Sequence, residues 1–143
     1  MTSLYLLDTN ILIAAMKGRI EVRGRSESEQ LSAMRLSAIV LGELEFGAEN
    51  SAYGDRNRAR LAALAQRLPF VGVDYDTTRH YAKVRAFLEL QGTPIGANDT
   101  WIAAQALAID ATPVTDNERE FSLVPGLALE NWLEHGQPGP CLS

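Results

Sequence analysis

Short apolar runs alternate along the chain with longer stretches in which apolar residues recur at helical spacing. The first run, Leu4–Leu7, is uncharged and unbroken, which is typical of a strand that is covered on both faces. It stops at Asp8, after which small polar residues that favour helix starts lead into a second apolar stretch, Ile11–Met16. The pattern predicts a buried strand followed by a helix, with Asp8 at the carboxyl end of the strand.

The rest of the chain continues this alternation of strand and helix patterns. The predicted helices are Glu27–Met34, Ala38–Glu49, Tyr53–Leu68, Asp76–Gln91 and a last one from Asn98 to about Ile109. The predicted strands are Arg35–Ser37, a short buried strand Phe70–Val73, Thr112–Thr115 and an edge strand Leu127–Glu130. Strands that alternate with helices predict an α/β fold in three layers, a mostly parallel central sheet with helices on both faces.

Length and composition bound the class of protein. The chain has 143 residues, enough for one domain with its own core, and we expect that domain to span residues 1–135. The Gly- and Pro-rich residues 136–143 predict a disordered tail. The single cysteine, Cys141, excludes an internal disulfide. No stretch has the pattern of a secretion signal or a membrane span, so we expect a cytoplasmic protein without a membrane partner.

The net charge and the motifs that are present or missing limit the kinds of substrate and catalytic site that the chain can have. The net charge of −5 argues against broad, non-specific binding to nucleic acid. It does not exclude a nucleic-acid substrate, because bound cations can reverse the local field of clustered acids. The sequence has no G-x-x-x-x-G-K-[ST] loop for nucleoside triphosphates. Its two histidines, His80 and His135, form no evident Ser-His-Asp or Cys-His arrangement, and we interpret His80 as structural or exposed.

Four acids are expected to meet at one edge of the sheet. The ends of successive parallel strands share an edge, so Asp8, Glu43 and Asp116 can converge there, and Asp99 can join from a helix start. Crowded carboxylates repel one another, and at neutral pH they need a cation or raised pKa values to coexist. Oxygen-rich sites of this kind suit Mg²⁺ or Mn²⁺, which assist the cleavage of phosphodiesters.

Two assignments near these acids can be argued from the residues. Glu43 and Glu45 are two positions apart on one predicted helix, so only one of them can face the site. Glu43 follows Gly42 and lies on a face of low bulk, which favours Glu43. The loop before the second strand carries three arginines that are either a solvated surface or contacts for RNA phosphates: Arg19, Arg23 and Arg25.

Four separated motifs resemble the PIN-domain ribonucleases and, among them, the VapC-type toxins of bacterial toxin–antitoxin pairs. The motifs are Leu6–Leu12, Ser37–Ala48, Ile95–Ala104 and Val114–Asn117 followed by Arg119–Phe121. The resemblance implies a PIN-like three-layer fold and an endoribonuclease that depends on Mg²⁺, with Mn²⁺ substituting. It implies structured RNA of the tRNA or rRNA class as substrate. It also implies a homodimer and a hetero-oligomer with a co-encoded, DNA-binding antitoxin.

The same resemblance implies roles for individual residues. Asp8 and Asp99 correspond to the principal metal ligands, and Glu43 to the third acid. For the fourth acid we favour Asp116, with Glu120 as its rival. Small polar residues that orient the acids or bound water complete the implied site: Thr9, Asn10, Ser37, Thr115 and Asn117.

Other interpretations stay open at this point. Each acid could be structural, as a helix cap, an exposed helix residue or a turn former, although four such coincidences at a family's spacing are required. The chain could be a PIN-fold binding module whose nuclease activity is weak or lost. A phosphotransferase would need a second aspartate at the position of Asn10, and a phospho-receiver domain would need a lysine late in the chain, where none follows Lys83.

Overall fold

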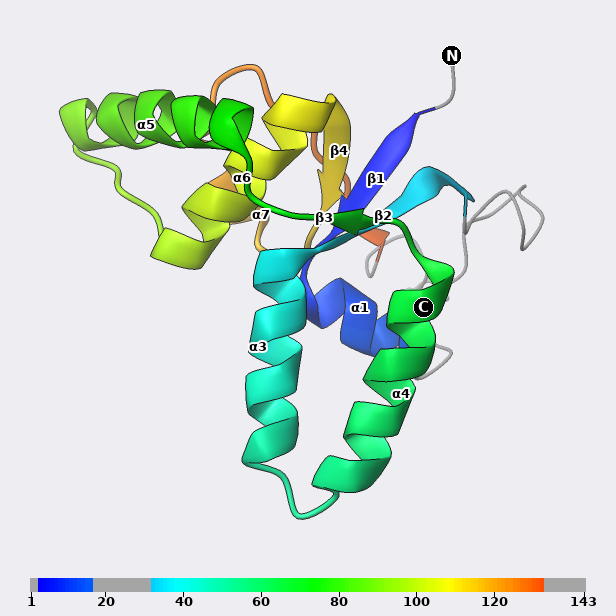
Figure 1. Cartoon of the computed structure of the whole chain (residues 1–143). Helices are drawn as coiled ribbons and strands as arrows, with labels where there is room; N and C mark the ends of the chain where they lie inside the picture. The colour runs from blue at the N-terminus through cyan, green and yellow to red at the C-terminus, as the bar shows by residue number, and fades with distance from the viewer. Residues whose placement is uncertain (1–2, 17–31, 133–143) are drawn as a thin grey trace, which may run out of the picture.

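The centre of the molecule is a parallel sheet. The computed structural model describes residues 3–16 and 32–132. It contains a four-stranded sheet in the order β3-β2-β1-β4 with every pair parallel. The strands are β1 (Leu4–Leu7), β2 (Met34–Ser37), β3 (Phe70–Val71) and β4 (Ala111–Val114). This arrangement confirms the predicted α/β fold with a parallel central sheet (Figure 1).

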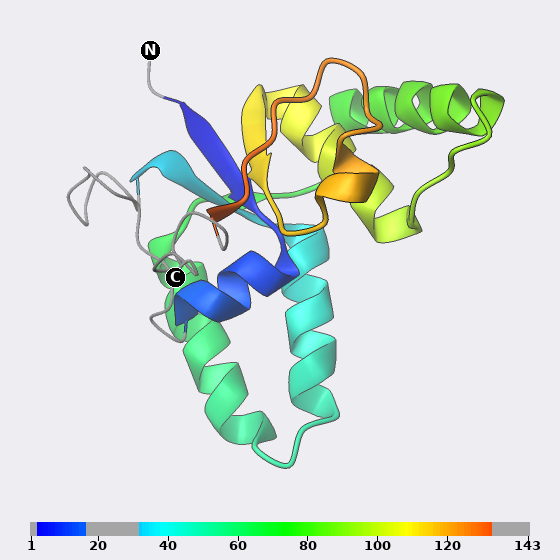
Figure 2. The ribbon, with the colours of Figure 1, turned by 180° about the vertical axis from the view of Figure 1, so that it is seen from behind.

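Helices join the strands in the alternation that the apolar pattern predicts. They are α1 (Thr9–Met16), α3 (Ala38–Glu49), α4 (Gly54–Arg67), α5 (Tyr75–Leu90), α6 (Ala97–Ile109) and α7 (Glu118–Phe121). From β1 to β2 to β3 the chain moves across the sheet in one direction. The connection from β3 to β4 then crosses back to the opposite edge of the sheet, beside β1. Right-handed crossovers therefore put α1, α3 and α4 on one face and α5 and α6 on the other. Both views show α1 beside the hairpin of α3 and α4, away from the paired α5 and α6 (Figures 1 and 2).

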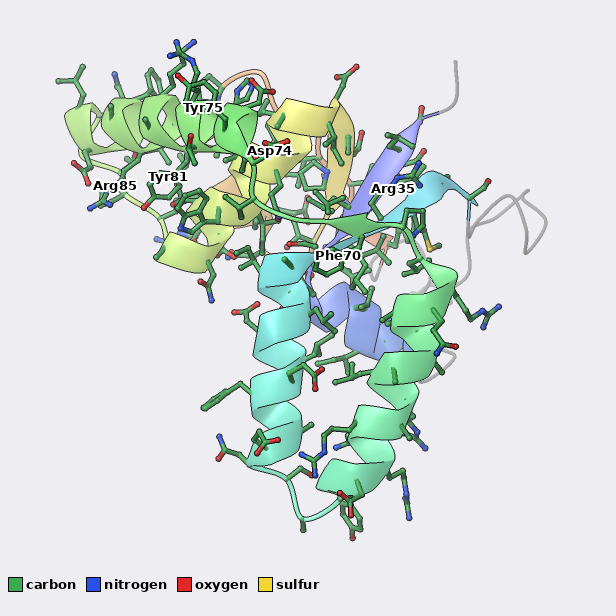
Figure 3. The ribbon with its side chains drawn as sticks, in the orientation of Figure 1. Arg35, Phe70, Asp74, Tyr75, Tyr81 and Arg85 are labelled. Atoms are coloured by element: carbon green, nitrogen blue, oxygen red, sulfur yellow. The ribbon has the colours of Figure 1, made fainter. Side chains whose placement is uncertain are left out.

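The core lies around β1 and α6. Leu6 and Leu7 in β1 are buried because β1 has a strand on each side. On α6, Ala103 and Ala106 are fully buried, and their small side chains let this helix pack closely on the sheet. Helix α5 packs on α6 through Tyr81, labelled in Figure 3, whose ring stacks on Trp101 with centroids 3.7 Å apart.

Two predicted strands and one helix end are wrong in detail. Met34, predicted as helical, begins β2 because its backbone pairs with β1 opposite Tyr5. The predicted buried strand Phe70–Val73 is a strand only over Phe70–Val71, and Phe70 is 59% exposed because β3 is the edge of the sheet (Figure 3). The predicted edge strand Leu127–Glu130 is a single bridge, in which Glu130 pairs with Val114.

The start of one helix and the presence of another also differ from prediction. Helix α5 begins one residue before Asp76, because Asp74 is the cap and accepts a hydrogen bond from the Thr77 amide at 2.9 Å. The short helix α7 was not predicted, since four residues are too few to show an apolar period.

Some predictions fall outside the described residues. They include most of the helix Glu27–Met34, the arginine-bearing loop, and the tail 136–143. Within the described ranges, no helix is both long enough and apolar enough to cross a membrane.

Candidate active site at the carboxyl edge of the sheet

Asp8 is the most buried acid of the predicted site. It follows β1, its amide donates to the Val114 carbonyl at 3.0 Å, and its side chain is 7% exposed. One carboxylate oxygen accepts from the Ile11 amide at 3.2 Å, so Asp8 also caps α1. The other oxygen accepts a hydrogen bond from the Thr115 hydroxyl. Capping and a site role are therefore compatible in this residue.

The pKa of Asp8 depends on its burial and on the residues around it. Burial is the main cause that raises the pKa of the Asp8 carboxyl, and the hydrogen bonds from Thr115 and Ile11 lower it in part. The charges of Asp116 and Glu43 raise the pKa further. These two carboxylates therefore lie close enough to repel Asp8, as the convergence of strand ends predicts.

Glu43 joins three helices at the site. One of its oxygens accepts from the Thr9 hydroxyl on α1 at 2.5 Å, and the other accepts from the Asn98 side-chain amide on α6 at 2.9 Å. Glu45 acts instead on α4, where its charge interacts with that of Arg58. The two glutamates thus take different directions from α3, as two helical positions require.

Asp99 lies in the first turn of α6, beside Glu120 of α7. Its pKa is raised to about 7, first by burial, then by a hydrogen bond and charge repulsion from Glu120 and by the charge of Asp8. The Asn117 side-chain amide donates to Asp99 at 3.1 Å and opposes this rise. The carboxylate of Glu120 also accepts from the Gly96 amide at 3.1 Å, which holds it next to the start of α6.

Asp116 follows β4 and faces α1. The side-chain amide of Asn10 donates to its two oxygens at 3.3 and 3.5 Å. Thr115 is fully buried and serves two partners, because its hydroxyl donates to Asp8 and accepts from the Asn117 amide at 2.9 Å. The residues after β4 therefore connect Asp8, Asp99 and Asp116.

The structure brings most of the predicted site residues together. The five acids at this edge are Asp8, Glu43, Asp99, Asp116 and Glu120, and four predicted supporting residues each hold one of them or the turn beside them: Thr9, Asn10, Thr115 and Asn117. Ser37 does not contact an acid; its hydroxyl donates to Gln105 at 2.5 Å. Arg19, Arg23 and Arg25 lie outside the described residues.

Asn98 is a site residue that sequence reasoning missed. In sequence the Asn-Asp pair at positions 98 and 99 predicts a helix start, because either residue is a good cap. In the structure the cap position is Gly96, so both side chains lie inside the first turn, where Asn98 reaches Glu43. The glycine at position 96, just before this pair, is the feature of the sequence that could have indicated an earlier helix start.

The donor chemistry of this edge fits a hard divalent cation. Across residues 3–16 and 32–132, no three acidic, histidine or cysteine side chains are arranged to chelate a metal as they stand. Each carboxylate instead holds a hydroxyl or amide donor. The oxygens are nevertheless of the type that Mg²⁺ and Mn²⁺ prefer. Burial is the main cause that raises the pKa values of Asp8 and Asp99, repulsion from neighbouring acids raises them further, and a shared cation relieves that repulsion.

A groove opens beside the site between α1, α3 and α4. Its volume is about 350 Å³ and its wall is largely apolar, with Ile13, Leu44 and Leu61 among the lining residues. Thr9 and Glu43 are among its polar lining residues. A partner that fills this groove would therefore reach one of the site acids.

Comparison with known proteins identifies the family. The PIN domain family model matches residues 5–127. Ribonuclease VapC2 of Rickettsia felis is 35% identical over 136 residues, covering 90% of this chain and 98% of the relative. The tRNA(fMet)-specific endonuclease VapC of Salmonella typhimurium is 36% identical over 128 residues, covering 90% and 97%.

Solved structures agree with the sequence relatives. The crystal structure of VapBC2 from Rickettsia felis, bound to a DNA fragment from its promoter, matches with a TM-score of 0.77 at 34% identity, covering 90% of this chain and 98% of that one. VapBC-1 from nontypeable Haemophilus influenzae matches with a TM-score of 0.79 at 34% identity and the same coverage. This chain therefore belongs to the PIN-domain family, and within it to the VapC ribonucleases.

Proposed function

We propose that this protein is a Mg²⁺-dependent endoribonuclease that acts as the toxin of a toxin–antitoxin pair. The observation that carries the proposal is the set of acids at one edge of the sheet, where Asp8 is buried and repelled by both Glu43 and Asp116. An edge of this kind suits the cleavage of phosphodiesters, and the relatives named as ribonucleases support RNA as the substrate.

Asp8, Asp99 and Glu43 would hold the cation, with Asp116 as the fourth acid. Bound Mg²⁺ supplies positive charge at the phosphate and lowers the pKa of the attacking water. Asp99 must lose its proton before it can act as a ligand, and its raised pKa makes this step sensitive to pH near neutrality. The charge of Glu120 acts on Asp99, whereas the charge of Asp116 acts on Asp8, the most buried acid of the site. For this reason we keep Asp116 as the fourth acid and Glu120 as its rival.

The neutral donors would keep the acids in place. Thr115 and the Ile11 amide orient Asp8, Asn117 orients Asp99, and Asn10 orients Asp116. Thr9 and Asn98 orient Glu43 from two different helices. Groups that orient metal ligands in this way typically contribute about 10- to 100-fold to metal affinity or activity.

We propose structured RNA, of the tRNA or rRNA class, as the substrate. The Salmonella relative is named for its action on tRNA(fMet), which supports the tRNA class. The arginines that could contact phosphate are Arg19, Arg23 and Arg25, and they lie outside the described residues. We also propose a cytoplasmic location, because intact tRNA and rRNA are available to a nuclease there.

We propose an antitoxin and a second copy of this chain as partners. The structural relatives from Rickettsia and Haemophilus are VapBC structures, and the one from Rickettsia is bound to DNA. The groove between α1, α3 and α4 offers an apolar wall for an antitoxin segment. The exposed apolar side chains Phe87 and Leu90, one turn apart on α5, offer surface for self-association.

Expression of this chain without its partner tests the function. New RNA 5′ ends should appear within minutes, at one or a few sites, and sequencing of these ends identifies the substrate. Purified protein should cleave the same RNA with Mg²⁺ or Mn²⁺ and not with EDTA. An intact RNA pool, together with tight binding of the antitoxin, would refute the nuclease and favour a PIN-fold binding module.

A further inference from the structure

Gln105 is a polar side chain at the centre of α6 that is completely buried. A buried amide is costly unless each polar atom has a partner, and glutamine is seldom found in this position. All its polar atoms are used here. Oε1 accepts from the Ser37 hydroxyl at 2.5 Å, and Nε2 donates to the carbonyls of Val71 and Gly72 at 3.1 and 3.0 Å.

These bonds join three separate parts of the fold. Ser37 is the last residue of β2 and also the cap of α3, accepting from the Ile39 and Val40 amides at 3.1 and 3.4 Å. Val71 ends β3, and Gly72 belongs to the connection that leads to Asp74 and α5 (Figure 3). Gln105 therefore fixes α6 to the start of α3 and to the end of the edge strand.

Helix α6 also carries two residues of the candidate site. Asn98 lies seven residues before Gln105, which is two helical turns, so both project from the same face of α6. Asn98 donates to Glu43 on α3 at 2.9 Å, while Gln105 accepts from the cap of the same helix at 2.5 Å. Two hydrogen bonds thus link α6 to α3, one exposed and at the site, the other buried and behind it.

We propose that Gln105 is a positioning residue of the nuclease. Through Ser37 and the two carbonyls at the end of β3 and just after it, Gln105 sets where α6 sits on α3, and so places Asn98 and Asp99 relative to Glu43. The buried bond is shielded from water and is one of three that Gln105 makes together, whereas the Asn98–Glu43 bond is exposed. The buried network therefore determines the helix position, and the exposed bond forms as a result.

This inference rests on the proposed function, because its catalytic consequence requires Glu43 and Asp99 to act on one phosphodiester. Catalytic geometry is sensitive to displacements of about 1 Å, which can cost roughly 100-fold in rate. A positioning role consequently predicts a loss of activity in protein that remains folded. A role limited to stability predicts loss only in proportion to the unfolded fraction.

The test replaces Gln105 by methionine, which keeps its length and removes its hydrogen bonds. It also replaces Ser37 by alanine, which breaks the Ser37–Gln105 bond and removes the cap of α3, while the bonds from Gln105 to Val71 and Gly72 remain. The matched control is Asp74→Ala, which removes the cap of α5 and touches neither α3 nor the acids. If Gln105→Met fails to fold, Ser37→Ala compared with Asp74→Ala decides the matter, since both lose a helix cap and only the former breaks the α3–α6 link.

Three measurements are made on folded protein below the melting transition. The first is kcat and KM on a short RNA that carries the cut site mapped for the wild type. The second is Mn²⁺ affinity, from the free-ion electron paramagnetic resonance signal, with Mn²⁺ alone as the probe. The third is the nuclear magnetic resonance signal of the Asn98 side-chain amide, which reports its bond to Glu43 without metal or RNA.

For Gln105→Met and Ser37→Ala we expect kcat and Mn²⁺ affinity to fall roughly 10-fold or more, KM to change little, and the Asn98 signal to move to that of a solvated amide. Asp74→Ala should melt at a lower temperature and match the wild type in all three measurements. Wild-type values for Gln105→Met would overturn the proposal. If wild-type protein neither cleaves RNA nor binds Mn²⁺, the proposed function fails, and the Asn98 signal alone still decides whether Gln105 positions α6.

Discussion

Replacing Asp99 by asparagine tests the electrostatics of the site, because it removes one charge and keeps the side-chain shape. The pKa of Asp99 is raised from 3.8 to about 7, first by burial and then by the hydrogen bond and charge of Glu120. The folded protein therefore holds this proton more tightly than the unfolded chain does. The stability that the proton contributes is complete below about pH 4 and is lost as the pH rises to about 7.

The size of this effect follows from linkage. A pKa that moves from 3.8 to about 7 corresponds to about 4 kcal/mol. Asp99 is only half-buried, so solvent screening reduces the cost of its ionised form, and we take about 1 to 2 kcal/mol at pH 8. In a chain of this size, that free energy corresponds to roughly 2 to 8 °C in Tm. Asp99→Asn should therefore melt above the wild type at pH 8, and the difference should disappear near pH 4.

Thermal melts in EDTA at pH 4, 6 and 8 measure this difference. Asp76→Asn is the control, because Asp76 is an exposed acid in the first turn of α5 and has the helix-dipole contribution of Asp99 without its burial. Asp76 also lies 3.8 Å from His80, an ion pair that exists only when that imidazole is protonated, so the comparison at pH 8 carries the most weight. Adding Mg²⁺ at pH 8 should raise the Tm of the wild type and not that of Asp99→Asn, which should also lose RNA cleavage. A variant that melts below the wild type at pH 8, or a gain that is the same at every pH, would show that the fold needs this carboxylate and would refute the reasoning.

Four further predictions concern the other acids. Asp8→Asn should abolish cleavage while Tm stays at or above that of the wild type, since asparagine can still cap α1; retained cleavage with a large fall in Tm would leave Asp8 only its capping role. Glu43→Gln should lose cleavage roughly 100-fold, and Glu45→Gln should be nearly silent in the same RNA assay; equal losses would contradict the helix phase. Asp116→Asn should weaken Mn²⁺ binding more than Glu120→Gln does, and the reverse order in a binding titration would make Glu120 the fourth acid. An antitoxin arginine that pairs with the acids should compete with Mg²⁺, so an antitoxin Kd that ignores Mg²⁺ would mean that inhibition works by covering the RNA path.

Much of the fold and of the candidate site could be predicted because local pattern and chain topology carry that information. The run Leu4–Leu7 is apolar because β1 is central, and the polar residues after it mark where the strand ends. Parallel strands place such ends at one edge, which is why the positions of Asp8 and Asp116 in sequence predict that they approach each other. Helix phase likewise separates Glu43 from Glu45.

Tertiary structure alone decided whether Phe70 is buried and which partner each polar group takes. Phe70 looks like a core residue in sequence, and it is exposed because β3 has a neighbour on one side only. Asn98 and Ser37 are both cap-type residues, and only the packing of α6 against α3 shows that one contacts Glu43 and the other Gln105. These contacts join residues 55 and 68 positions apart. A local pattern reports the period and the ends of an element, whereas contacts at that separation depend on where whole elements dock, which is set by the packing of the entire core.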